Sequence, residues 1–192
     1  MARKKYDFRP DTRTDRFKGF HMTRLQRLNI LKWLLFIALG IFLLVVQDVI
    51  MSRVRVFGAT TDLPAAFILL ITVLVGSNHG SVFVLSASLF YWFSGSAPGP
   101  YCIALLTILG IIAAVLRQLW WRRGLRSTVL CAGGALILYE IAIFAVALVS
   151  GLAPWSRVGV FLLTALYSWV LMIPLYPLAC KIGKIGGEPW KE

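Results

Sequence analysis

Glu140 is the residue of this chain best placed to do chemistry, because it is the one charged residue well inside a predicted membrane-spanning segment, residues 127–149. A charge at the centre of a bilayer costs about 2.5–3.5 kcal/mol on insertion scales. The residue therefore predicts either a site for an ion, a proton or a polar ligand, or a carboxyl that joins two helices by hydrogen bonds to Thr164, Tyr167 or Ser168. No second ionisable group is predicted inside the bundle, which favours the structural role.

Other groups for catalysis or metal binding are sparse. The two histidines, His21 and His79, are far apart in the sequence. The three cysteines, Cys102, Cys131 and Cys180, have the spacing of neither a disulfide framework nor a metal site. No glycine-rich phosphate loop with a following lysine occurs. We therefore expect no enzymatic activity, no cofactor and no bound metal.

The composition predicts a membrane protein. The chain has 192 residues and is 59% hydrophobic, whereas soluble domains are roughly 45–50% apolar. No Asp, Glu, Lys or Arg occurs between Asp62 and Arg117. A membrane β-barrel would need alternating apolar and polar residues, and stretches such as residues 34–39 (LLFIAL) do not alternate. We therefore predict an all-α integral membrane protein.

Turn-forming residues divide the apolar sequence into six expected transmembrane helices. Asp62 is a predicted N-cap of the second helix, with Pro64 in its first turn. Residues 76–80 (GSNHG) are predicted to separate the second helix from the third. The six helices are expected at residues 30–50, 63–76, 81–93, 101–119, 127–149 and 158–180. They form one transmembrane domain, residues 29–182, between a basic, mostly disordered tail (1–28) and a short tail (183–192).

The expected second and third helices are shorter than a bilayer core. A second possibility is one long, tilted helix over residues 63–93, which would give five spans. The charges favour six spans, because these place seventeen of the twenty Lys and Arg residues on the side of the N-terminus, as the positive-inside rule requires. We therefore expect both termini in the cytoplasm.

The net charge of +12 is concentrated ahead of the first apolar segment, where half of the Lys and Arg residues lie at or before Lys32. This position favours binding of the N-terminal tail to anionic lipid. Binding to nucleic acid is not expected.

Small residues gather at two places. Gly110 and Ala114 have a small-xxx-small spacing, and Gly133 and Gly134 lie near the start of the fifth expected helix. Such residues let helices approach closely. Packing within the chain is the favoured explanation, and a partner interface is the alternative.

Several short motifs, in this order and spacing, resemble those of the MreD family of rod-shape-determining membrane proteins over residues 45–182. Gln47 resembles a glutamine after helix one, and residues 58–63 (GATTDL) resemble the family's G-x-x-P-D-L motif, with Thr61 in place of proline. The other matching positions are Gly76 and Gly80 between helices two and three, Gly95 and residues 99–101 before helix four, and the basic residues 117–123 after it. An acidic residue late in helix three is absent here, so no role tied to it is carried over.

The resemblance implies a non-catalytic subunit of the bacterial cell-elongation complex in the cytoplasmic (inner) membrane. Its partner would be MreC, and through MreC the MreB filament, RodA and a penicillin-binding transpeptidase. The implied fold is similar to the substrate-binding S components of energy-coupling-factor transporters. An S component of a vitamin transporter is therefore the alternative function. The candidate functional or packing residues are Glu140, Gln47, Asp62, Gly76, Gly80, Gly99, Gly110, Gly133 and Gly134.

Overall fold

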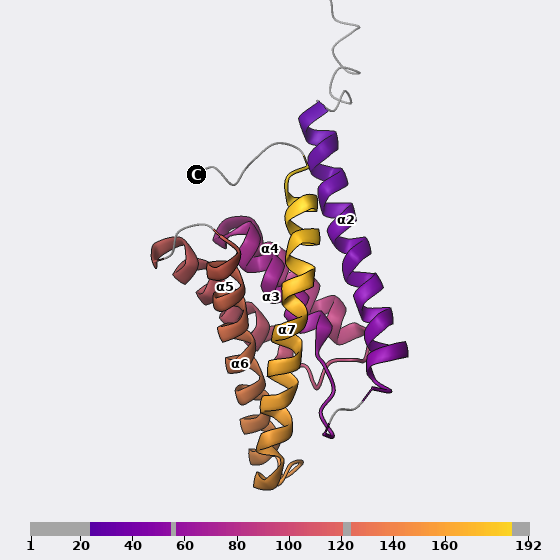
Figure 1. Ribbon diagram of the computed structural model, residues 1–192, viewed down its shortest axis with the longest axis vertical. Helices are drawn as coiled ribbons and strands as arrows, with labels where there is room; N and C mark the ends of the chain where they lie inside the picture. The colour runs from indigo at the N-terminus through magenta and orange to yellow at the C-terminus, as the bar shows by residue number, and fades with distance from the viewer. Residues whose placement is uncertain (1–23, 55–56, 121–123, 186–192) are drawn as a thin grey trace, which may run out of the picture.

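The computed structural model describes residues 24–54, 57–120 and 124–185, and these residues are mostly helical (Figure 1). The first helix, α2, continues directly into a short π-helix, η1, and a 3-10 turn, η2, precedes the last helix. In chain order the elements are α2 (Arg24–Val46), η1 (Gln47–Met51), α3 (Leu63–Val75), α4 (Ser77–Phe93), α5 (Tyr101–Trp120), α6 (Leu125–Val149), η2 (Trp155–Arg157) and α7 (Val158–Gly183).

Four of these helical segments are long and apolar enough to cross a membrane. They are Arg24–Met51, Tyr101–Leu119, Leu125–Val149 and Trp155–Gly183. The predicted class, a helical membrane protein, is therefore confirmed. The helix α3 is apolar but shorter, at 13 residues.

The start of α3 has the cap that the sequence predicts. The Asp62 carboxylate accepts a hydrogen bond from the backbone N–H of Ala65 (3.0 Å), and Pro64 lies in the first turn. A proline costs little there, because the N–H groups of the first turn have no partner within the helix.

Two predicted helix boundaries were wrong. The first helix begins at Arg24 rather than residue 30, so part of the expected tail is helical; residues 1–23 lie outside the described part of the chain. The break between the second and third helices is Gly76 alone, because residues 77–80 form the first turn of α4. The single long helix over residues 63–93 is also excluded, since α3 and α4 are separate helices packed on each other.

The centre of the bundle is α3. Its residues Leu63 to Leu74 are all buried, as expected for a helix that is apolar on every side. It packs against α4, α5, α6 and α7, and less extensively against α2. Its one polar side chain, Thr72, donates its hydroxyl proton to the carbonyl of Ile68 (2.7 Å).

The helix α2 lies at the edge of the bundle. Few of its residues are buried, namely Lys32, Phe36 and Leu43. The described start of α2 and the end of α7 lie at the same end of the molecule (Figure 1). We call this end, which carries Arg24, Arg27, Lys181 and Lys184, the basic end.

Candidate functional site

Gln47 joins the end of the first helix to the start of the central one. Its side-chain Nε2 donates to the carbonyl of Thr61, and its Oε1 accepts from the backbone N–H of Leu63 (3.2 Å). Gln47 begins the π-helical turn η1, and such turns occur frequently at functional sites. One amide side chain thus closes the link between η1 and α3.

Asp62 connects three helices at the same junction. One carboxylate oxygen caps α3, and the other accepts a hydrogen bond from the Tyr91 hydroxyl on α4 (3.0 Å). The backbone N–H of Asp62 donates to Ser168 Oγ on α7 (2.7 Å). Gln47 and Asp62, which the sequence analysis singled out separately, therefore lie in one polar junction.

Glu140 is buried on α6, with 4% of its surface exposed. None of its three expected partners bonds to it in the structure. The Ser168 hydroxyl instead donates to the carbonyl of Thr164 (2.8 Å) and accepts from the Asp62 N–H. The electrostatic neighbour of Glu140 is the carboxyl of Asp62. Asp62, which the sequence indicated as a helix cap and as part of the motif at residues 58–63, is thus a second carboxyl that interacts with Glu140.

Two hydroxyl groups near this junction are buried without a hydrogen-bond partner in the described part of the chain, Tyr139 Oη and Thr61 Oγ1. Tyr139 is fully buried and interacts electrostatically with both Asp62 and Glu140. Buried polar groups usually have partners, and one that lacks them costs about 1–3 kcal/mol. The interior of the bundle therefore combines two carboxyls with a phenol whose hydrogen-bonding capacity is unused by the described residues.

The C-terminal end of α3 is held in place by α5. Arg117 Nη1 donates to the carbonyls of Val73 and Leu74 (3.2 Å to Leu74), which lie in the last turn of α3. Cationic side chains are favourable at a helix C-terminus, where carbonyls lack partners within the helix. The neighbouring Gln118 accepts a hydrogen bond from the Ser77 hydroxyl (2.9 Å), which fixes the first turn of α4.

Gly76 and Gly80 make this sharp connection possible. Gly76 has φ +94°, and a Cβ atom there would lie 2.6 Å from Gln118 Nε2. A Cβ atom at Gly80 would lie 2.7 Å from the Thr72 carbonyl oxygen. The two glycines thus let α4 start directly against the end of α3.

The remaining small residues have different surroundings. Gly110 faces Val84 and Thr72, and Gly133 lies under the Trp169 ring, so both serve packing within the chain. Gly134 is exposed, and a Cβ atom added there would have no neighbour within 4 Å among the described residues. Gly99 lies in the α4–α5 link, where a Cβ atom would contact the Tyr101 ring.

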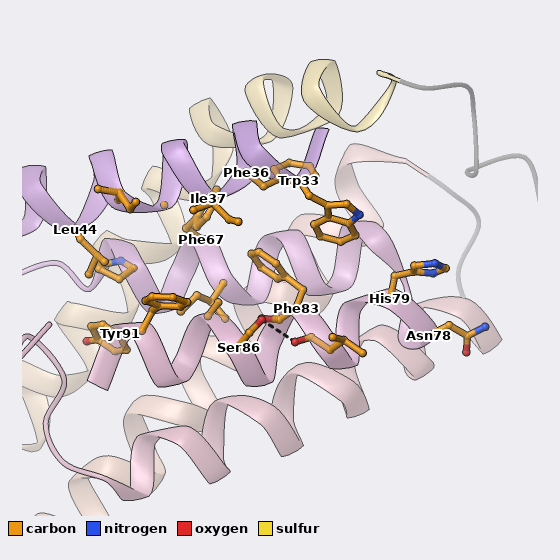
Figure 2. A pocket seen from close by; sticks show the side chains of 17 residues that line it. Trp33, Phe36, Ile37, Leu44, Phe67, Asn78, His79, Phe83, Ser86 and Tyr91 are labelled. Carbon is orange, nitrogen blue, oxygen red and sulfur yellow. Dashed lines mark hydrogen bonds between the residues drawn. The ribbon is translucent and has the colours of Figure 1, made fainter. Parts of the chain in front are cut away.

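A groove of about 670 Å³ separates α2 from α4, with α3 at its base (Figure 2). Its walls are almost entirely apolar, and its few polar side chains include Asn78, His79 and Ser86. Sequence reasoning missed this groove, because its existence depends on how far α2 stands from α4. Only the aromatic residues of α2 and α4 could have suggested a shared surface.

Comparison of the chain with models of known protein families, with curated proteins and with solved structures finds no match. Among the described residues, no group of three or more His, Cys, Asp and Glu side chains could hold a metal ion.

Proposed function

We propose that this protein is a non-catalytic membrane subunit of the bacterial cell-elongation complex, which binds MreC and so supports peptidoglycan synthesis and rod shape. RodA and the penicillin-binding transpeptidase would be reached through that complex. The observation that supports this proposal most is the placement of the motif residues. Gln47 and Asp62 fix one end of α3, while Gly76, Gly80 and Arg117 fix the other.

A central helix that is fixed at both ends suits a scaffold subunit. The motif residues immobilise a buried central helix instead of converging on a substrate, which fits a protein that presents its outer surface to partners. That surface is mostly apolar helix flank, as on α6, where Leu130, Leu138 and Ile141 are about half exposed. Association in lipid then depends on close packing and a few hydrogen bonds. The links 51–61 and 94–100 would add polar contacts, and their described residues lie at the end opposite the basic end.

The same proposal places the protein in the cytoplasmic membrane as a six-span protein with both termini in the cytoplasm. The positions of the two described chain ends at the basic end support an even number of crossings. The distribution of Lys and Arg supports the cytoplasmic orientation of that end.

The alternative function, an S component of a vitamin transporter, is favoured by a different observation. Glu140 is buried near Asp62, and the hydroxyl of the adjacent Tyr139 is buried without a partner among the described residues. Ionisable residues inside a membrane often mark sites for ions or polar ligands. Under this alternative, a polar substrate would bind between α3, α6 and α7.

Depletion of the protein from a rod-shaped host separates the two functions. We expect depleted cells to become round, and MreC to co-purify with the tagged full-length protein from membranes. Cells that stay rod-shaped but lose uptake of a vitamin would refute the proposal in favour of the alternative. Growth on excess vitamin is the control, since it rescues a transport defect and does not rescue a defect in elongation.

A further inference from the structure

The groove between α2 and α4 has one polar end and a long apolar body. Trp33, Phe36, Phe67 and Phe83 line it, and Asn78 and His79 in the first turn of α4 lie at the same end of the groove as Trp33, which is the basic end (Figure 2). From there it follows α2 as far as Leu44 and α4 as far as Tyr91. Its shape and polarity therefore match an elongated amphiphile.

Aromatic rings fix the width of the groove. The Trp33 and Phe83 ring centroids are 5.9 Å apart, and the Phe67 and Phe83 centroids are 6.5 Å apart. These rings bridge α2, α3 and α4 where the backbones of α2 and α4 do not pack closely. Side-chain contacts across its base therefore define the shape of the groove.

Basic residues near the polar end indicate the charge of the headgroup. Arg24 and Arg27 are exposed on the turns of α2 that precede Trp33, whereas Lys32 is buried and does not line the groove. No acidic residue occurs in α2, α3 or α4. A zwitterionic headgroup would find no matching anion here, whereas an anionic one would be attracted.

We infer that this groove binds one anionic phospholipid, with its acyl chains along α2 and α4 and its headgroup beside His79 at the basic end, toward Arg24 and Arg27. This goes beyond the proposed function and is independent of it. The bound lipid would fasten α2 to a bundle that it otherwise contacts only lightly.

The test measures lipid retained by the purified full-length protein. The protein is extracted in mild detergent from vesicles containing equal amounts of phosphatidylglycerol and phosphatidylcholine, and bound lipid is counted by native mass spectrometry. We expect one retained phosphatidylglycerol, preferred over phosphatidylcholine by about fivefold or more for each basic side chain engaged. The Arg27→Gln variant should retain lipid with a reduced preference, while Arg126→Gln, outside the groove, should behave as wild type.

The second part of the test fills the groove with a bulky side chain. Ala87→Trp should abolish retention, whereas Ala104→Trp, the same change on the exposed side of α5, should not. Val82→Trp on the groove rim, 70% exposed, repeats the test if Ala87→Trp fails to fold. Equal retention by the Ala87 and Ala104 variants would mean unspecific annular lipid and would overturn the inference. Equal retention of both lipids by the wild-type protein would also overturn the inference. It would be overturned as well if the Ala87→Trp variant lost a co-purifying protein while its lipid retention was unchanged.

Discussion

At the scale of single residues, Gln47 and Asp62 form the best-defined feature of the molecule. Each could be selected from the sequence, one as a motif residue and the other as a helix cap. The sequence could not show that these two residues lie in one junction, because this requires the chain between them to fold back on itself. The same is true of Glu140, which interacts electrostatically with Asp62 and forms no hydrogen bond with the α7 residues that similar depth suggested.

Asp62 allows a direct test of this junction. Asp62→Ala removes the cap of α3, worth about 0.5–2 kcal/mol, and leaves the Tyr91 hydroxyl without its acceptor, worth about 1–3 kcal/mol. We expect a clearly lower unfolding temperature in detergent, and a much smaller loss for Asp62→Asn, which keeps an acceptor oxygen. Tyr91→Phe in the Asp62→Ala background should recover part of the loss. Equal destabilisation by the Ala and Asn variants would contradict the hydrogen-bonding role.

Glu140 decides between the two proposed functions. If the protein is a scaffold subunit, Glu140→Gln should leave both abundance and rod shape unchanged. The neutral amide keeps hydrogen-bonding capacity near Tyr139 and removes the cost of a buried charge beside Asp62. The measurement is cell shape at matched membrane levels of variant and wild type. Loss of rod shape at normal abundance would instead show that the ionisable group itself is required, as at an ion or ligand site.

At the scale of elements, the sequence predicted the order of the helices and missed the details of their connections. Apolar length and the cap at Asp62 were sufficient to place α3. The cluster of residues 76–80 favours a loop because Gly, Ser and Asn are common in turns. In the structure only Gly76 leaves the helical conformation, since the packing of α4 on α3 and the bond from Ser77 to Gln118 stabilise the extra turn.

Leucine substitutions at Gly110 and Gly134 should have different effects on the unfolding temperature. Gly110→Leu should lower the unfolding temperature of the purified protein, because Val84 and Thr72 already occupy the space and overpacking costs about 1–3 kcal/mol. Gly134→Leu should leave the unfolding temperature unchanged, since none of the described residues lies within 4 Å of an added Cβ.

Gly159→Leu, a second exposed glycine with open surroundings, is the matched control for the added leucine. If Gly110→Leu unfolds like wild type, the internal role of this glycine is wrong. If Gly134→Leu is stable but loses MreC on purification, this face of α6 is a partner contact.

At the scale of the whole molecule, composition was enough to predict a helical membrane protein, because uncharged apolar stretches of this length have few alternatives. The groove beside α2 was not predictable by the same reasoning. Lipid-facing and groove-facing side chains are both apolar, so the sequence of α2 does not show which of its residues line a cavity. Distance between helices is a property of the packed bundle alone.

The orientation of the molecule in the membrane is the last prediction. The described ends of the chain lie together at the basic end, and the positive-inside rule assigns this end to the cytoplasm. Reporter fusions after Arg126 and at Glu192 should therefore both give cytoplasmic signals. Fusions in the links at Gly95 and Gly151 should give periplasmic signals and serve as the opposite control. Five spans, with α3 and α4 together crossing once, would instead place Arg126 and Glu192 in the periplasm, and the even-span topology would then be wrong.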